Sequence, residues 1–112
     1  MTQQRLPVSS ECLACFIDRA LDEVGCDNTL RLAGRYREDH APDDVGLERR
    51  LADRGGYCDC EIIANAYRPH ERLQPQPFEL PDGSAVVPII VMPPCSGVPE
   101  GSTDACANWQ LV

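Results

Sequence analysis

The stretch Gly55-Gly56-Tyr57-Cys58-Asp59-Cys60-Glu61 divides this chain, because a helical pattern ends at the two glycines and a Cys-x-Cys pair follows. Side chains at positions i and i+2 of an extended segment point to the same face, so both sulfurs can reach one ion. Cysteine thiolates are ligands that zinc prefers in proteins. The stretch therefore predicts the end of a helix and one part of a metal site.

Seven cysteines among 112 residues need an explanation. A chain of this length forms one domain with a modest core, which a metal ion or a cross-link would stabilise noticeably. Residues 1–7 lack the pattern of a secretory leader and no apolar run has the length of a membrane span, so we expect a cytoplasmic protein without membrane contact. In a reducing compartment, clustered cysteines are more often metal ligands or redox thiols than disulfides.

The distribution of charge argues against nucleic acid as a partner. The net charge is −8, and all ten basic residues are arginines within residues 5–72. Phosphate recognition depends on positive charge, so we expect no broad nucleic-acid-binding face. We expect the arginines to form solvated helix faces paired with nearby acids. A less favoured interpretation is a local arginine patch on Arg31, Arg35, Arg37, Arg49, Arg50 and Arg54.

Three helices are predicted before the Cys-x-Cys pair. The first spans residues 10–24, where Ser9 or Ser10 can cap the start and Gly25 can end the helix. The second follows the capping signal at residues 26–29 and ends near Asp39-His40. The buried stripe of the first helix consists of Leu13, Phe16, Ile17, Ala20, Leu21 and Val24.

The third helix begins at Pro42, because proline is favoured at the first helical position. Its inner face consists of Val45, Leu47 and Leu51, and the glycine pair ends it. After Cys60, residues 62–67 are compatible with a short helix or a strand, and we favour a helix that Asp59 could cap.

Residues 68–112 have a different character, because they hold eight of the ten prolines. The turn signal at residues 81–84 predicts a small hairpin between residues 78–80 and 85–91, with Pro88 restricting it to an edge. We expect the polar segment 95–109 to be ordered, because it contains two cysteines and Trp109. We therefore predict a mainly α fold. Residues 1–68 form a domain of three to four helices, and an extended proline-rich arm, residues 69–112, packs on it. Metal–thiolate sites staple the two together.

Two blocks resemble a known family: Gly25-Cys26-Asp27-Asn28-Thr29-Leu30-Arg31 and the run from Gly55 to Asn65. With their spacing, the chain resembles, over about residues 10–68, a family of small bacterial proteins called domain of unknown function 2695. The resemblance implies a fold and a cysteine set, and no established activity. Many members carry histidine where this chain has Asn28, which implies a Cys-x-His plus Cys-x-Cys ligand set. Cys26, Cys58 and Cys60 match that motif here.

Helix length restricts which cysteines can meet. If residues 12–24 are helical, Cys15 and Cys26 are separated by eleven residues, or roughly 16 Å along the helix axis. Sulfurs that share one zinc ion lie about 4 Å apart, given Zn–S bonds near 2.3 Å. We therefore expect that Cys12 and Cys15 do not share an ion with Cys26.

Two groupings satisfy this restriction. In the first, a four-thiolate site joins the start of the first helix to the end of the third, and Cys26 is a buried thiol; its ligands are Cys12, Cys15, Cys58 and Cys60. In the second, Cys26, Cys58 and Cys60 form one site with a fourth ligand such as Asp27 or water. The remaining cysteines then form another site, from Cys12, Cys15, Cys95 and Cys106. Only the second grouping accounts for all seven cysteines. Partial disulfides, or thiols that hold no metal, are also compatible with the sequence.

Some candidates also have a purely structural or a redox interpretation. Cys12-x-x-Cys15 at a helix start is the arrangement of redox dithiols, although no thioredoxin-like βαβ pattern surrounds it. Asp59 and Glu61 could form an acid–base pair beside a metal, but a cap or an acceptor behind the ligands explains Asp59 more simply.

The sequence predicts a small cytoplasmic protein that binds one or two Zn²⁺ ions. We expect the metal to be mainly structural and the chain to be an interaction or accessory module for an unidentified protein partner. The sequence leaves enzymatic activity open, and we favour a role without it, because closed four-thiolate sites leave no open position for chemistry. Two competing hypotheses are an active metal or thiol protein with an open Cys26/Cys58/Cys60 site, and a redox switch at Cys12 and Cys15.

Overall fold

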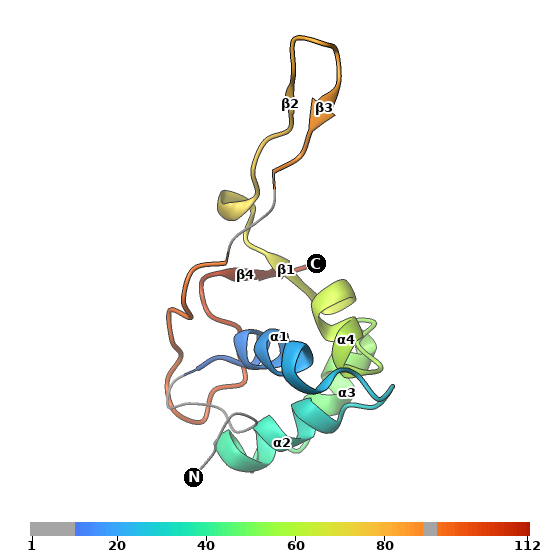
Figure 1. The fold of residues 1–112 in the computed structure, drawn as a ribbon. Helices are drawn as coiled ribbons and strands as arrows, with labels where there is room; N and C mark the ends of the chain where they lie inside the picture. Colours follow the sequence, from blue (N-terminus) through green and yellow to red (C-terminus); the bar gives the residue numbers. More distant parts are fainter. Residues whose placement is uncertain (1–10, 89–91) are drawn as a thin grey trace.

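The computed structural model describes residues 11–88 and 92–112 (Figure 1). Its helical elements are α1 (Leu13–Val24), α2 (Arg31–His40), α3 (Leu47–Asp53), α4 (Asp59–Glu61), the π-helical turn η1 (Ile62–Ala66) and the 3-10 turn η2 (Glu71–Leu73). Its strands are β1 (Tyr67–Pro69), β2 (Phe78–Glu79), β3 (Ala85–Val86) and β4 (Trp109–Leu111). The fold is mainly α, with cysteine clusters that could hold metal, as the sequence predicted.

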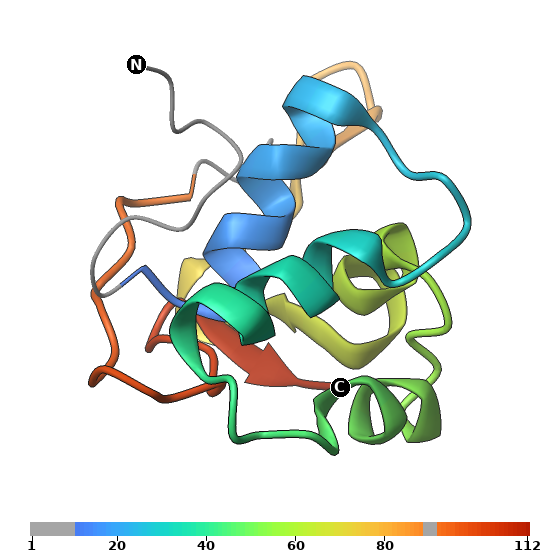
Figure 2. The same ribbon diagram turned by 90° about the horizontal axis from the view of Figure 1, so that it is seen from below.

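The core lies between α1, α2 and η1. The predicted stripe of α1 is confirmed at Phe16 and Ile17, which are fully buried, and Ile62 of η1 packs into the same cluster. The rings of Phe16 and Tyr36 lie 5.7 Å apart between centroids, and the Tyr36 hydroxyl donates a hydrogen bond to the carbonyl of Glu11. The segment before α1 is thereby fixed against α2. Figure 2 shows α1 and α2 side by side.

The cap of α1 differs from the expectation. The predicted caps Ser9 and Ser10 lie outside the described residues, and Cys12 occupies the N-cap position with an extended backbone. The Cys12 Sγ accepts a hydrogen bond from the backbone N–H of Cys15 at 3.3 Å. The helix therefore begins at a candidate metal ligand. At the other end, Gly25 ends α1 with a φ of 71°, as predicted.

The predicted start of the third helix was wrong. Residues 42–46 form turns, α3 begins at Leu47, and Val45 is 83% exposed instead of lying on the inner face. The physical reason is that Asp44 is held in this turn: its backbone N–H donates to Ala41, and its carboxylate binds the guanidinium of Arg50.

The glycine pair ends α3 for two separate reasons. Gly55 has a φ of 89°, a left-handed conformation that glycine adopts without steric cost. Gly56 donates its N–H to the carbonyl of Leu51, and a Cβ at Gly56 would lie 3.1 Å from that oxygen. This close turn directs the chain into the Cys-x-Cys segment.

The C-terminal arm makes two separate small sheets. The predicted hairpin is confirmed as an antiparallel pair of β2 and β3, which projects away from the helices in Figure 1; the part of the predicted strand at residues 89–91 lies outside the described residues. The antiparallel pairing of β1 with β4, with Tyr67 opposite Leu111, was not predicted. The pairing of β4 with β1 brings the end of the arm back to the helices, after the hairpin has projected away from them.

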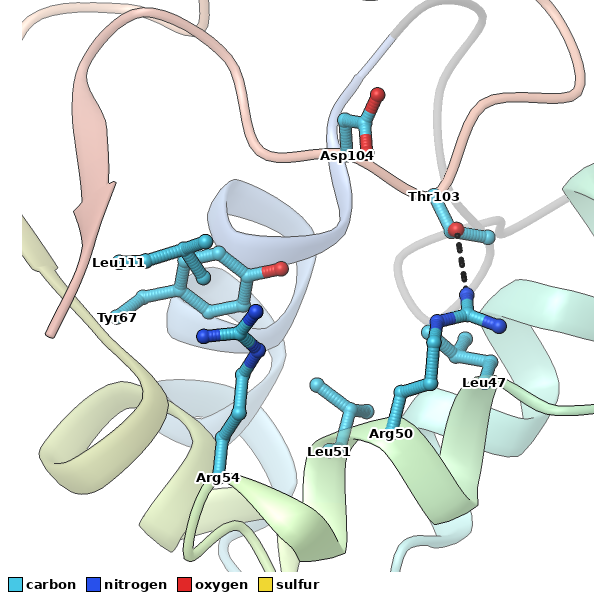
Figure 3. Close-up of a pocket in the computed structure, with 8 residues that line it drawn as sticks. All are labelled: Leu47, Arg50, Leu51, Arg54, Tyr67, Thr103, Asp104 and Leu111. Carbon is cyan, nitrogen blue, oxygen red and sulfur yellow. Dashed lines mark hydrogen bonds between the residues drawn. The ribbon is translucent and has the colours of Figure 1, made fainter.

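The arm also contacts the beginning of α3 (Figure 3). Asp44 accepts hydrogen bonds from Arg50 at 2.8 and 2.6 Å and from the Thr103 hydroxyl at 2.7 Å. These donors lower the pKa of the Asp44 carboxyl to about 2, with Arg50 as the largest cause. The turn before α3 and the arm are therefore held together by an ionised carboxylate.

Replacing Asp44 by asparagine should destabilise the fold only above the pH at which Asp44 ionises. A carboxyl with a lowered folded-state pKa stabilises above its unfolded pKa, about 3.9, and this contribution is lost as the pH falls towards about 2. Because Arg50 is half exposed, we expect a loss below about 1 kcal/mol at neutral pH. Urea denaturation of the parent and the variant between neutral pH and pH 2 measures this difference in the free energy of unfolding. Asp43→Asn serves as the exposed control. A difference that does not shrink on acidification would contradict the stabilising role of the ionised Asp44 carboxylate.

Candidate metal centres

Four cysteines meet where α1 begins and the arm returns. The Sγ atoms of the four residues all lie within 4.8 Å of one another, and we call this set the four-sulfur cluster; it consists of Cys12, Cys15, Cys95 and Cys106. Cys12 and Cys106 are buried and the other two are half-buried. Four sulfurs on one zinc ion would lie about 3.8 Å apart, from Zn–S bonds near 2.3 Å in a tetrahedron. The Sγ atoms of Cys15 and Cys106 lie 3.8 Å apart, which matches this spacing.

Backbone and side-chain donors surround these sulfurs. The N–H groups of Cys12 and Gly97 donate to the Cys95 Sγ at 3.2 and 3.4 Å. The indole Nε1 of Trp109 donates to the Cys15 Sγ at 3.3 Å. Donors aimed at a sulfur stabilise its thiolate form, which is the form that binds metal. These donors therefore oppose the effect of burial, which favours the neutral thiols of Cys95 and Cys15.

The pKa values within the four-sulfur cluster are shifted in opposite directions. The hydrogen bond from the Cys15 thiol lowers the pKa of Cys12 to about 5, and the same bond raises the pKa of Cys15. Burial raises the pKa of Cys95. A metal ion bound at the four-sulfur cluster would require these thiols to be deprotonated, because the thiolate is the ligand form.

Three further cysteines meet around the glycine–Cys-x-Cys stretch, and we call them the three-sulfur cluster: Cys26, Cys58 and Cys60. Their Sγ atoms also lie within 4.8 Å of one another, with 3.3 Å between Cys58 and Cys60. Cys58 is 7% exposed, Cys26 is half-buried and Cys60 is exposed. The loop after α1 supplies Cys26, and the start of α4 supplies the other two. This cluster lies at the surface, in contrast to the four-sulfur cluster.

Hydrogen bonding also shifts the pKa values of Cys26 and Cys60, in the three-sulfur cluster, in opposite directions. The backbone N–H of Cys60 is the largest cause that lowers the pKa of Cys26, and the N–H of Asn28 adds to it. A hydrogen bond with the Cys58 thiol raises the pKa of Cys60 to about 12. The carboxylate of Glu61 lies 3.6 Å from the Cys58 Sγ and also accepts the N–H of Tyr57.

Asp59 positions the three-sulfur cluster without belonging to it. Its carboxylate is fully buried and accepts the N–H groups of Leu32 at 2.9 Å and Ala33 at 3.1 Å, so it caps α2 from a distant segment. Its own N–H donates to the carbonyl of Thr29 at 2.9 Å. Asp59 is thus a helix cap, as expected, but of α2 and not of its own helix. Burial raises its pKa, and the two N–H groups oppose that shift.

The structure divides the seven cysteines into two clusters, which correspond to the second of the two groupings left open by the sequence. Cys12 and Cys15 do not lie in one group with Cys58 and Cys60, and Cys26 has sulfur neighbours. Asp27, considered as a fourth ligand, instead accepts hydrogen bonds from Thr29 and is not among the converging ligand atoms.

The contact of Trp109 with the Cys15 sulfur was not predicted beyond its role in ordering the tail. The available signal was the spacing, since Trp109 follows Cys106 by three residues and the backbone N–H of Trp109 bonds to the carbonyl of Cys106. A turn of this kind places the indole on the same side as the sulfur.

A separate cavity of about 140 Å³ lies between α3 and the arm (Figure 3). Arg54 and Tyr67 lie close together at one side, and Arg50 at the other side bonds to Thr103. No cysteine lines it, and ligand pockets are commonly about 300 Å³ or larger. The cavity is a gap in the packing of the arm against α3. The two sulfur clusters therefore remain the candidate functional sites.

The fold and these clusters define a small, mainly α, cysteine-rich domain with two sites that could hold metal ions. Residues 13–65 match the family described as "Protein of unknown function (DUF2695)", which confirms the family that the sequence resembles. The matched segment contains the three-sulfur cluster and Cys15; Cys12, Cys95 and Cys106 lie outside it.

Curated relatives are similar over about half of the chain. Uncharacterized proteins from two strains of Mycobacterium tuberculosis and from Mycobacterium bovis are 42% identical over 55 residues, 49% of this chain. The chain spans 56% of the length of these relatives. No solved structure matches the chain at a significant level. In the described part of the chain, no helix is long and apolar enough to cross a membrane.

Proposed function

We propose that this chain is a small zinc-binding protein of the cytoplasm whose metal is mainly structural. The observation that carries the proposal is the four-sulfur cluster, because it joins the first turn of α1 to two distant points of the arm. Thiolates are soft ligands that favour zinc among the common divalent ions, and closed four-thiolate sites in proteins are structural. The division into a helical domain, residues 1–68, and an arm, residues 69–112, fits a metal that holds the two together.

The biological role that follows is that of an interaction or accessory module with a protein partner. The projecting hairpin supports this role, since Phe78 and Val87 are 50% and 69% exposed there. The acidic net charge of −8 disfavours nucleic acid. We assign no catalytic residue and propose no enzymatic activity.

Native mass spectrometry of the reduced protein tests the metal assignment. We expect two zinc ions, one for each cluster, and loss of both with a strong chelator. A single ion that disappears in Cys95→Ser and persists in Cys60→Ser would restrict the proposal to the four-sulfur cluster. Reduced protein that holds no metal would overturn it.

A second candidate function is an active metal or thiol site at the three-sulfur cluster. The supporting observation is that three sulfurs converge at the surface while, in the described ranges 11–88 and 92–112, no fourth ligand atom completes the group. A bound metal would then keep an exchangeable position. A redox switch at Cys12 and Cys15 is a weaker candidate, because both sulfurs already lie within the four-sulfur cluster.

Replacing Asn28 by histidine should close the three-sulfur cluster. Asn28 has a φ of 69°, which histidine tolerates better than most residues, and its N–H donates to the Cys26 Sγ at 3.4 Å. An imidazole at this position can supply the fourth bond to a zinc ion. We expect the metal of this cluster to be bound at least about tenfold more tightly, a gain of ~1.4 kcal/mol or more.

Chelator competition measures the affinity, and the absorption of the cobalt-substituted protein reports the added nitrogen ligand. The matched control is Asn28→Gln, which lengthens the side chain without adding an imidazole. Equal affinities of the histidine and glutamine variants would show that position 28 does not reach the ion.

A further inference from the structure

The two clusters differ in the feature that decides which ion each can hold. The four-sulfur cluster is largely buried and offers four ligand atoms, whereas the three-sulfur cluster offers three and opens to solvent at Cys60. Zinc in a structural site takes four protein ligands. The three-sulfur cluster is therefore incomplete as a closed zinc site, where water would have to supply the fourth bond, and it is complete for an ion that is satisfied by three sulfurs.

The charge around the three-sulfur cluster also favours an ion that three sulfurs satisfy. Three thiolates around a divalent ion leave one net negative charge, and the Glu61 carboxylate already lies 3.6 Å from the Cys58 Sγ. Like charges at such distances are mutually destabilising. A trivalent centre with three thiolates is neutral, so it adds no negative charge beside Glu61.

Geometry adds a third argument. The Sγ atoms of Cys58 and Cys60 lie 3.3 Å apart, closer than the ~3.8 Å between sulfurs of a tetrahedral zinc site. A trivalent centre that carries a lone pair holds its three ligands at narrower angles than a tetrahedron. The lone pair would then take the position at which no residue of the described ranges supplies a ligand.

We propose that Cys26, Cys58 and Cys60 form a binding site for trivalent arsenic, taken up as arsenous acid. The inference rests on the second candidate function, the open three-sulfur site, and names its ligand class. Arsenous acid is uncharged at neutral pH, so the acidic protein does not repel it.

Binding is a ligand exchange without a change of oxidation state. Each thiol forms one As–S bond as one As–OH bond breaks, and the thiol proton leaves with that hydroxide as water. Three exchanges release three water molecules and leave arsenic(III) bound to three sulfurs. The exposed Cys60 offers the accessible first contact, and Cys26 and Cys58 complete the site from within 4.8 Å.

The test adds arsenite to the zinc-loaded, reduced full chain and follows the species by native mass spectrometry. We expect one arsenic per chain, with the mass of three lost protons, while one zinc ion stays in the four-sulfur cluster. Cys60→Ser should weaken arsenite binding at least about tenfold, as expected when one of three bonds is lost. Cys95→Ser, in the other cluster, should leave arsenite binding unchanged.

Phenylarsine oxide, which needs only two thiols, separates the loss of a ligand from the loss of the fold. The Cys60→Ser protein should still bind this compound through Cys26 and Cys58 while it fails to hold arsenite. Arsenite that displaces zinc from the four-sulfur cluster, or that binds Cys60→Ser as well as the parent, would overturn the inference.

The outcomes for zinc and for arsenic are distinguishable. A chain that holds two zinc ions and takes up no arsenite would refute the arsenic site and leave the structural zinc proposal in place. A chain that holds no zinc yet binds arsenite through three thiols would support the inference and overturn the zinc proposal.

Discussion

Cys106→Ser should cause the largest loss of stability among the single substitutions considered for this chain. The four-sulfur cluster connects residues far apart in sequence, since Cys15 and Cys106 are separated by 91 positions. For comparison, a disulfide that closes a loop of about 100 residues is worth ~4.7 kcal/mol in the loop-entropy treatment. A metal site that makes the same connection contributes on that scale, so we expect a loss of about 4 kcal/mol.

That loss is large compared with the total stability of a small domain, about 5–15 kcal/mol. The arm should separate from α1 first, because Trp109 and Cys106 pack together against Cys15 at this point. Trp109 is the only tryptophan, which makes its fluorescence a direct reporter of the cluster. Chelation of the parent protein should reproduce the change in fluorescence.

Urea denaturation with zinc present, followed by Trp109 fluorescence, measures the effect of Cys106→Ser. The matched control is Cys60→Ser, which removes a thiol from the exposed three-sulfur cluster and should leave the arm and the fluorescence close to those of the parent. If Cys106→Ser kept the zinc content and the unfolding midpoint of the parent, the four-sulfur cluster would not hold a structural metal.

Asp59→Ala should produce the second largest effect, and it should affect both the fold and the three-sulfur cluster. The Asp59 side chain is fully buried and accepts the N–H groups of Leu32 and Ala33. Removing the carboxylate leaves two donors without partners at the start of α2, and each such group costs about 1–3 kcal/mol. We expect a loss of roughly 2–4 kcal/mol.

The same substitution should weaken metal binding by Cys58 and Cys60. These cysteines flank Asp59, and its carboxylate fixes the start of α4 against α2, next to the loop that carries Cys26. Without that anchor the two sulfurs lose their fixed position relative to Cys26. We therefore expect the metal of the three-sulfur cluster to exchange faster while the metal of the four-sulfur cluster is retained.

Thermal denaturation and a metal count with and without a chelator measure these two consequences. Asp59→Asn keeps one acceptor oxygen and should lie between the parent and the alanine variant. Asp53→Ala removes an exposed carboxylate at the end of α3 and should change stability by no more than about 0.5 kcal/mol. An alanine variant at position 59 as stable as the position 53 control would refute the capping role.

Local signals of the sequence were sufficient for most helical elements. The stripe that contains Phe16 and Ile17, the stop at Gly25 and the stop at the glycine pair all depend on neighbours within a few residues, and the structure confirms them. The start of the third helix was wrong because Pro42 permits a helix as readily as a turn. The contacts of Asp44 with Arg50 and Thr103 decide between them.

The sequence by itself determined most of the helices, the hairpin and the family resemblance, because these depend on local patterns. It also excluded Cys12 and Cys15 from any site with Cys26, because helix rise fixes distances along one element. Only the tertiary structure decided that Cys95 and Cys106 meet Cys12 and Cys15, that β4 pairs with β1, and that Asp59 caps α2. These contacts join segments that are far apart in sequence, and the number of residues between two such segments does not determine their distance in space. The Cys-x-Cys stretch could therefore be predicted as part of a site, but its partner Cys26 was selected by the packing of α1, α2 and α4.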